Sequence, residues 1–197
     1  MAKVEAPLFS FGARGKLANS VVYFPWKGVN AIRSWVIPAN PKTASQRTQR
    51  GRMSDAVDAW HSARYTADDV SAWNRYAGVL EQIMSGFNAM VKTLVKEAII
   101  GNAWEPMRNC TTSGVGTDRF TVRLEKVRGG NAPILHWGTR KTHFPDYHAM
   151  TDLGIDAWSW EITGLTKDTL YYFYADVGTS GTDYGRLGVY AQRTAAA

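Results

Sequence analysis

The chain divides into three stretches that differ in how apolar and polar residues are ordered. Residues 1–42 place short apolar runs between closely spaced prolines and glycines, which excludes a long helix. Residues 43–101 repeat apolar residues with the period of an amphipathic helix, and residues 102–197 alternate apolar and polar positions as half-buried strands do. We therefore predict an α+β protein in three parts: an extended N-terminal arm, a small helical unit and an all-β domain.

Two β-prone runs lie close together within the arm. They cover residues 20–24 and 30–37, and Pro25-Trp26-Lys27-Gly28 stands between them. This spacing predicts a β-hairpin with a loop of about four or five residues. An isolated hairpin is marginally stable in water, so we expect it to pack on the rest of the protein or to be ordered by a partner.

Capping signals mark the beginnings of helices in the middle stretch. Thr43 is followed three residues later by Gln46, and Thr66 by Asp69, which is the spacing of a capping box. We expect a first helix over about residues 43–62 and a second from Thr66 onward, with Val70, Trp73, Ala77 and Leu80 facing inward. A third helix is expected over residues 85–100, with Gly101 as its left-handed cap.

The last stretch contains several runs with strand character. Gly, Asn, Asp and Thr clusters separate them, as expected for turns. Such a series of short strands in fewer than 100 residues predicts a β-sandwich. The strand candidates are residues 119–127, 132–139, 157–165, 170–177 and 185–194.

A corner motif stands between two of these strand candidates. Leu165 is followed by a short turn and then by Thr169-Leu170-Tyr171. This pattern resembles the corner before strand F of fibronectin type III domains, where the tyrosine hydroxyl bonds back to the backbone. The resemblance covers about residues 103–195 and implies a sandwich of that type, with Leu165 and Tyr171 in the corner and Trp137 as the candidate for the family's early-strand tryptophan. Such sandwiches most often serve as spacers or binding modules.

Charge is distributed unevenly along the chain. Residues 1–52 hold nine Lys and Arg and one acid, Glu5, whereas residues 53–197 hold 14 basic and 16 acidic residues. This asymmetry predicts that the N-terminal part meets an acidic surface or a polyanion. The alternative is a merely solvated segment, which the arm's Phe, Tyr and Trp residues disfavour.

Residues that could carry chemistry have simpler structural interpretations. Histidine and aspartate are common zinc ligands, and the candidates here are His136, His143, Asp146 and His148. Their spacing does not place them on one face of the protein. Cys110 is interpreted as a small buried apolar residue, and adjacent acids such as Asp69 as complements of a helix dipole. We expect no catalytic residue, no metal, no cofactor and no enzymatic activity.

Targeting and membrane signals are weak. The apolar runs are shorter than a membrane span, and the N-terminus lacks the apolar block of a secretory signal. We therefore expect synthesis in the cytoplasm and no membrane partner. Hydrophobic residues make up 45% of the chain and aromatic residues 12%, which excludes a wholly disordered protein.

A series of short motifs spans about residues 12–95 in a fixed order. They are Gly15-Lys16-Leu17, Val21-Val22-Tyr23, Trp26-Lys27-Gly28, Ile32-Arg33-Ser34, Pro38-Ala39-Asn40-Pro41-Lys42-Thr43, Gln46, Arg50, Trp60, Trp73-Asn74 and Ser85-Gly86-Phe87-Asn88-Ala89-Met90.

This series resembles small structural proteins of tailed bacteriophages and prophages. The resemblance implies a virion component made in the bacterial host, whose partners are major capsid, neck or tail proteins and further copies of itself. Capsid decoration is the preferred role, and a neck, tail or fibre connector is the alternative. The arm would bind the lattice through Phe9, Phe11, Arg14, Tyr23, Phe24, Trp26, Lys27, Arg33, Trp35, Arg47 and Arg50.

Two further functions stay open at this point. The sandwich is a candidate carbohydrate- or host-surface-binding module through Trp158, Trp160, Tyr172, Tyr174 or Tyr184, although alternation predicts that one of the two strand sets is core. The arm is a candidate nucleic-acid binder, which we disfavour because its apolar residues suit protein packing better than a base-stacking groove.

Overall fold

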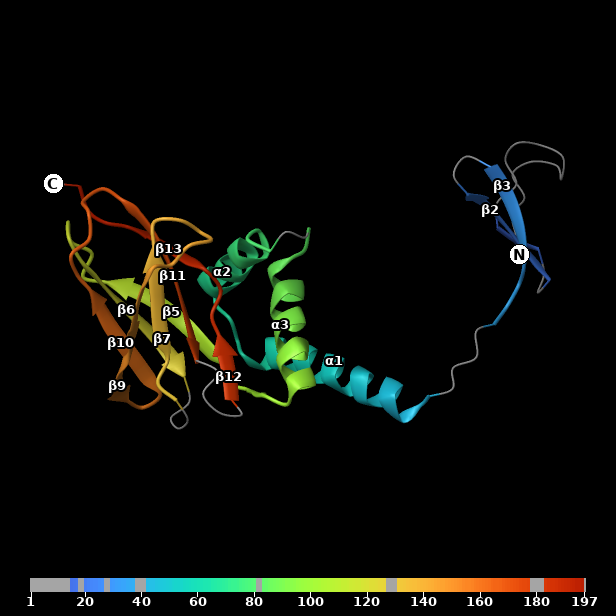
Figure 1. The fold of residues 1–197 in the computed structure, drawn as a ribbon, viewed down its shortest axis with the longest axis horizontal. Coiled ribbons are helices and arrows are strands. Elements are labelled where there is room, and N and C mark those ends of the chain that lie inside the picture. Colours follow the sequence, from blue (N-terminus) through green and yellow to red (C-terminus); the bar gives the residue numbers. More distant parts are fainter. Residues whose placement is uncertain are drawn as a thin grey trace. The chain divides into compact units, whose positions relative to one another are not determined.

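A computed structural model describes residues 15–17, 20–26, 29–37, 42–80, 83–126, 131–177 and 183–196 (Figure 1). The chain forms two compact units, residues 1–43 and residues 44–197, which are called the N-terminal unit and the body below. Four of the predicted arm residues, Phe9, Phe11, Arg14 and Lys27, lie outside the described residues, and of Trp26 only the backbone is described.

The described part of the N-terminal unit is a three-stranded antiparallel sheet in the order β1-β2-β3. Its strands are β1 (Gly15–Leu17), β2 (Val21–Trp26) and β3 (Val29–Ser34). The register pairs Trp26 with Val29, so only two residues join β2 to β3 and the predicted longer loop is wrong. Pro25 lies within β2 opposite Asn30 of β3, beyond Tyr23, the last β2 residue that pairs with the described part of β1.

The three predicted helices are present in the body. They are α1 (Ala44–Ser62), α2 (Ala67–Ala77) and α3 (Gly86–Ile100). Thr66 and Asp69 form the complete capping box of α2. Gly101 ends α3 at φ 96°, a backbone conformation that favours glycine.

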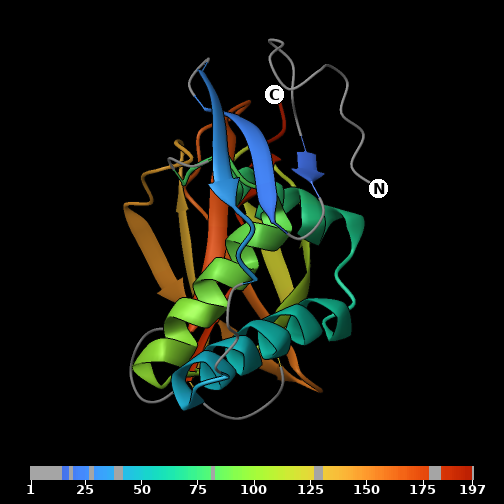
Figure 2. The same ribbon diagram turned by 90° about the vertical axis from the view of Figure 1, so that its right-hand side faces the viewer.

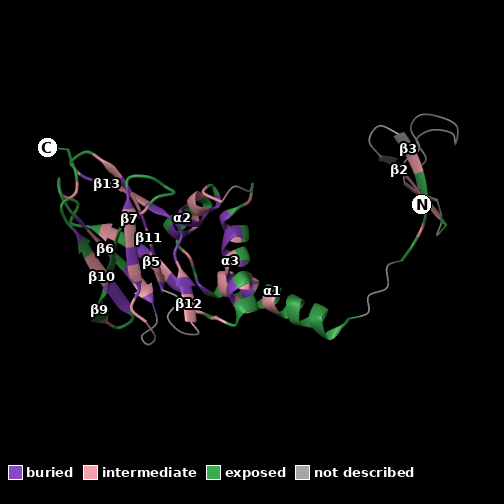
Figure 3. Ribbon diagram, viewed as in Figure 1, coloured by how far each residue is buried: buried purple, intermediate pink, exposed green. Residues whose placement is uncertain are grey.

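The helices form an aromatic-rich core whose largest buried member is Trp73. Ala56, Met90 and Leu94 are buried around it, whereas the expected inward residues Val70 and Leu80 are half-buried. The first turns of α1 are exposed (Figure 3). The basic side chains of that segment therefore lie in solvent.

The rest of the body is a β-sandwich of two sheets. One sheet has the order β5-β6-β10-β9, and the other has the order β4-β12-β11-β7-β8 with β13 also paired to β11. This arrangement corresponds to the A-B-E-D and C′-C-F-G sheets of immunoglobulin-type sandwiches, so the predicted fibronectin type III-like fold is confirmed. The strands are β4 (Ala103–Trp104), β5 (Met107–Ser113), β6 (Phe120–Lys126), β7 (Ile134–Gly138), β8 (Asp146–Ala149), β9 (Thr151–Gly154), β10 (Ala157–Ile162), β11 (Leu170–Val177), β12 (Asp183–Arg186) and β13 (Tyr190–Arg193).

The corner before β11 has the geometry of a tyrosine corner. The backbone N–H of Thr166 donates to the Tyr171 hydroxyl at 3.0 Å, and Leu165 packs against the sandwich core. Trp137 also packs against this core from β7, while Trp158 is buried within it. The indole N–H of Trp158 donates to the Lys126 carbonyl at 3.2 Å.

The last predicted strand, residues 185–194, is interrupted in the structure. β12 and β13 are separate because the chain turns to α2 after Leu187, whose N–H still donates to the Ala175 carbonyl of β11 at 2.8 Å. The Val189 N–H donates to the Ala72 carbonyl of α2 at 3.0 Å. Arg75 also donates to the Val189 carbonyl, at 2.6 Å. Ala72 belongs to the sandwich core, so the helices and the sandwich share one compact body. Figure 2 shows α1 and α3 crossing the same side of this body.

Candidate functional site

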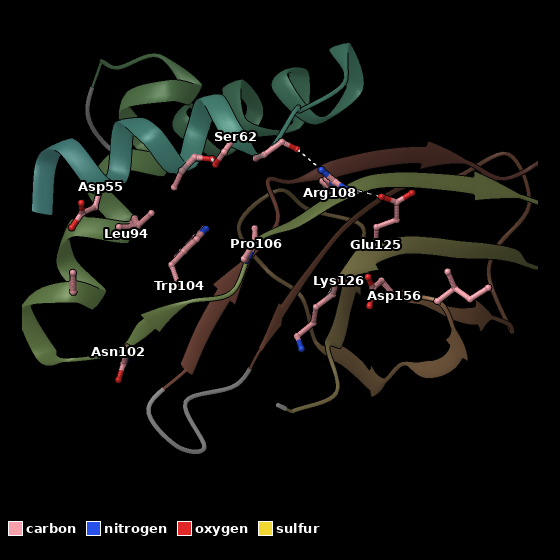
Figure 4. A pocket seen from close by; sticks show the side chains of 14 residues that line it. Asp55, Ser62, Leu94, Asn102, Trp104, Pro106, Arg108, Glu125, Lys126 and Asp156 are labelled. Atoms are coloured by element: carbon pink, nitrogen blue, oxygen red, sulfur yellow. Dashed lines mark hydrogen bonds and ion pairs between the residues drawn. The ribbon is translucent and has the colours of Figure 1, made fainter. Parts of the chain in front are cut away.

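A pocket of about 610 Å³ lies where α1 and α3 meet one end of the sandwich (Figure 4). Small side chains on α1 and α3 leave the space, because Ala59, Ala63 and Ala98 stand where larger residues would fill it. Leu94 and Pro106 complete an apolar floor. Polar members of the lining are Asp55, Ser62, Asn102, Arg108, Glu125, Lys126 and Asp156.

Ion pairs fix the charged side of this pocket. Lys126 is only 2% exposed, and its Nζ lies 2.9 Å from Glu105 Oε2. Arg108 Nε lies 3.2 Å from Glu125 Oε2, and Arg108 Nη1 donates to the Ala63 carbonyl at 3.3 Å. The Lys126 pair is buried, so removal of either partner would leave an uncompensated charge. The half-exposed Arg108–Glu125 pair joins β5 to β6 and contributes little to stability, whereas the bond from Arg108 to the Ala63 carbonyl holds the end of α1 against β5.

Trp104 presents an unused donor at the pocket. Its indole nitrogen is buried and has no hydrogen-bond partner among the described residues. Figure 4 shows the nitrogen end of this side chain turned toward α1. A buried donor without an acceptor is costly, but this nitrogen has almost no accessible surface, so a ligand could reach it only after neighbouring side chains move.

The pocket lining combines an apolar floor with charged side chains. None of its 14 residues is His or Cys, and its two cations are held by carboxylates. Its apolar floor suits an apolar ligand, and the exposed carboxylate of Asp55 lies at its rim.

The N-terminal sheet has two chemically different faces. The register places Lys16, Val22 and Arg33 side by side on one face, together with Phe24. Cations cover aromatic rings there: Lys16 Nζ lies 3.9 Å from the Trp35 ring centroid, and Arg33 Cζ lies 5.6 Å from that of Phe24. This face is basic and aromatic.

The opposite face of the sheet is apolar. Val21, Tyr23 and Ile32 lie on it, and Ile32 is 61% exposed. Beyond β3, Val36 and Ile37 are 69% and 77% exposed. None of the described side chains of residues 16–43 belongs to a buried residue: Lys16, residues 21–24, Ala31 and Trp35 are half-buried and the others are exposed.

The predicted arm residues therefore separate into two groups. Tyr23, Phe24, Arg33 and Trp35 come together in the N-terminal sheet. Arg47 and Arg50 instead lie exposed on the first turns of α1, in the body.

Asp69 is a buried polar centre that its capping role alone did not reveal. Its carboxylate accepts from Thr66 N–H at 2.9 Å, Asn109 N–H at 3.1 Å and Cys110 N–H at 3.4 Å, and from the Tyr190 hydroxyl. Burial, followed by the charge of Asp69, raises the pKa of the Cys110 thiol, which disfavours its reactive thiolate. This cluster joins α2 to both sheets and is structural.

A second aromatic group lies on the outer face of the β7-β11 sheet. Arg186 Cζ lies 4.0 Å from the Tyr174 ring centroid and 4.3 Å from that of Tyr76. The ring of His136 stacks on Tyr174 at 4.7 Å, and its Nε2 lies 3.3 Å from Asp176 Oδ1. Tyr174 and its neighbour Tyr172 are half-buried, so this face is partly open to solvent.

The candidate zinc ligands are not gathered. His136 pairs with Asp176, His148 stacks on Trp160 with ring centroids 3.5 Å apart, and His143 lies in a turn that bridges to Arg140. Within the described residues, no group of three His, Cys, Asp or Glu side chains could hold a metal ion. The helices of the described chain are also too short or too polar to cross a membrane.

Comparison with known proteins reveals similarity only in fold. No family model and no curated protein sequence matches the chain. A computationally redesigned β-sandwich protein is 18% identical, with a TM-score of 0.37, over 46% of this chain and 95% of that one. A fibronectin type III domain of human collagen XX is 16% identical (TM-score 0.34, 46% and 94% covered), and the FN5 domain of Drosophila Lar is 15% identical (TM-score 0.33, 47% and 97% covered).

Proposed function

We propose that this protein is a non-catalytic structural component of a tailed-bacteriophage virion, which docks on the particle through its N-terminal unit and presents the body outward. A capsid-decorating role is preferred, and a neck, tail or fibre connector is the alternative within the same class. The resemblance of about residues 12–95 to such virion proteins supports this class.

The observation that carries the proposal is the absence of buried residues among the described side chains of the N-terminal unit. A small sheet in which none of the described side chains is buried has no core among those residues, and such sheets normally need a further surface. A partner that covers the Val21, Tyr23 and Ile32 face would supply the missing core.

Docking couples the ordering of the N-terminal unit to the burial of its apolar face. Each apolar side chain that becomes fully buried contributes about 1.5–3 kcal/mol, which offsets the conformational entropy lost on docking. On the other face, Lys16 and Arg33 would form charge-assisted hydrogen bonds with acidic groups of the lattice. Repetition of the contact over a symmetric particle adds avidity, so each single interface can be small.

Point variants of the apolar face test this proposal. Ile32→Asp and Tyr23→Asp should prevent incorporation of the protein into particles produced by the encoding phage, as measured by immunoblotting of purified virions. The matched control is Leu153→Asp in the body, which alters a residue of similar exposure, 56% against 61% for Ile32. Normal incorporation of both sheet variants would contradict the proposal.

A second candidate function is carbohydrate binding by the outer face of the sandwich. It is favoured by the half-buried rings of Tyr172 and Tyr174, with Arg186, His136 and Asp176 as neighbouring polar groups. Trp158 and Trp160 contribute less, because Trp158 is buried and Trp160 packs against the core. Glycan-array binding that is lost in Tyr174→Ala and retained in Trp160→Phe would support this function.

A further inference from the structure

We propose that the outer edge of β3 binds an extended strand of a lattice protein, whose side chains are alternately apolar and acidic. The added strand would continue the N-terminal sheet by β-augmentation, in which main-chain hydrogen bonds supply affinity and side chains supply selectivity. The inference rests on the proposed function in taking the N-terminal unit as a docking element, and it names the contact that this function leaves open.

The outer edge of β3 presents a regular row of backbone donors and acceptors. β3 is an end strand, and no strand of the described residues pairs with its outer side. The Trp35 N–H donates to the Ser20 carbonyl at 2.6 Å, and bonds to β2 recur at every second residue counted back from Trp35. Pro25, which has no N–H, lies at one of the intervening pairs, as this phase requires. The residues whose N–H and C=O groups point outward are Asn30, Ile32 and Ser34.

This edge lacks most of the features that protect sheet edges from further pairing. Natural edges are blunted by bulges, prolines, charges or very short strands. β1, at the other edge of the sheet, has only three residues, whereas β3 pairs with β2 over six consecutive residues without a register shift. β3 contains no proline, and Arg33 is its one charged residue. In the body, by contrast, the edge strands β5 and β9 both have register shifts against their neighbours.

The two faces of β3 define the side chains that suit an added strand. Ile32 lies on the apolar face opposite Tyr23, and Arg33 lies on the basic and aromatic face opposite Val22. Both Ile32 and Arg33 are exposed. Directly opposite residues of neighbouring strands share a face, so an apolar residue suits the position beside Ile32 and an acidic residue suits the position beside Arg33. The strand that fits therefore alternates apolar and acidic side chains.

Charge favours another protein over a second copy of this chain. Residues 6–52 contain no Asp or Glu, so this part of the chain offers no acidic partner to another copy. A two-fold pairing of β3 with itself would also bring the Arg33 side chains of both copies onto one face of the joined sheet. Like charges that face each other across neighbouring strands are destabilising, whereas opposite charges contribute to pairing. An acidic strand therefore complements this edge better than β3 itself does.

Amide NMR spectra of the full-length protein with two synthetic peptides test the inference. The acidic probe is a capped peptide of alternating valine and glutamate, and the basic control has lysine in place of each glutamate. The acidic peptide should shift the outward amides of β3 and slow their hydrogen exchange. It should bind roughly three- to tenfold tighter than the basic one, because an opposite-charge pair with Arg33 replaces a like-charge pair. Arg33→Glu should reverse this preference.

Backbone variants test the main-chain contact separately from the side chains. Ser34→Pro removes one outward N–H but neither an apolar side chain nor a bond to β2, and proline is tolerated at a strand edge. It should weaken binding of the acidic peptide by roughly tenfold, because one main-chain bond is lost. Ser34→Ala keeps the N–H and is the matched control, which should bind as the wild type does. The amide shifts of residues 21–24 report whether the sheet persists in each variant.

Several outcomes would overturn the inference. Slow exchange of the outward β3 amides in the protein alone would show that the edge is already paired, and concentration-dependent shifts without peptide would identify a second copy as its partner. No shift at millimolar peptide, or an equal loss of binding in Ser34→Ala, would also contradict it. The proposed function is scored separately: if Ile32→Asp is excluded from particles while Ser34→Pro is incorporated normally, docking through the N-terminal unit stands and strand addition fails.

Discussion

The hydroxyl of Tyr190 donates a hydrogen bond to the buried carboxylate of Asp69, which stands 121 residues earlier in the chain. Asp69 lies in the first turn of α2 and Tyr190 begins β13, so this one bond ties the helices to the last strand of the sandwich. The same carboxylate accepts from the N–H groups of Asn109 and Cys110 in β5. α2 is thereby fixed to both sheets at once.

Loss of this bond should destabilise the body. Tyr190→Phe removes a buried hydrogen bond to a charged group, for which about 1.5–3 kcal/mol of unfolding free energy is expected. Asp69→Asn should cost more, because it also weakens the capping box and the bonds from β5. Urea unfolding followed by tryptophan fluorescence measures both. Asp68→Asn, at the exposed neighbouring position, is the matched control, and an equal effect there would contradict the role of Asp69.

Alkaline pH should destabilise the protein through Tyr190. Burial, with the nearby charges of Cys110 and Asp69, raises the pKa of its phenol above the ordinary value of 10.0. The unfolded chain then loses this proton at a lower pH than the folded protein, so the stability contribution is complete below pH 10 and falls as pH rises further.

The slope of stability against pH measures this effect. Above pH 10 the free energy of unfolding should fall more steeply in the wild type than in Tyr190→Phe, by up to about 1.4 kcal/mol per pH unit for one proton. Equal slopes in the two proteins would show that Tyr190 ionises in the same range when folded and unfolded.

Cys110 should be unreactive in the folded protein. It is buried, it is the only cysteine in the chain, and its pKa is raised mainly by burial. Ellman's reagent should therefore label no thiol under native conditions and one thiol per chain in denaturant. Rapid labelling of the native protein at neutral pH would contradict the buried position of this side chain.

Gly188 should tolerate no side chain. A Cβ at this position would lie 2.4 Å from the backbone of Ala72 and Trp73, so α2 would have to move away from the segment between β12 and β13. Gly188→Ala should destabilise the body by about 1–3 kcal/mol, as overpacking does. Gly51→Ala is the control with the opposite sign, because nothing lies within 4 Å of a Cβ there and alanine favours a helix interior by about 0.5–1 kcal/mol. Differential scanning calorimetry distinguishes the two directions.

Local signals in the sequence predicted the elements well. The capping box at Thr66 and the left-handed cap at Gly101 each depend on a few neighbouring residues, and both are present. Strand alternation and the Leu165–Tyr171 corner likewise indicated the sandwich. The loop prediction at the hairpin is wrong for a local reason: proline is typical of loops, but Pro25 lies within β2 and pairs with Asn30 of β3.

Long-range features could not be predicted in the same way. The capping role of Asp69 explained its position completely, and its other partners are 40 or more residues away. The pocket forms where α1, α3, β5 and β6 come together, and no sequence motif predicts that arrangement. The small residues Ala59 and Ala63, four positions apart, are the only local feature of the sequence that is related to it. β5 was missed because its polar composition, Met107–Ser113, lacks regular alternation.

The most direct test of the account is particle incorporation of a chain that lacks residues 2–43. The body forms a compact unit with its own core, so the truncated protein should fold, as judged by a cooperative thermal transition. It should be absent from purified virions that carry the full-length protein in wild-type infections. A folded truncation that enters virions at the normal copy number would contradict docking through the N-terminal unit.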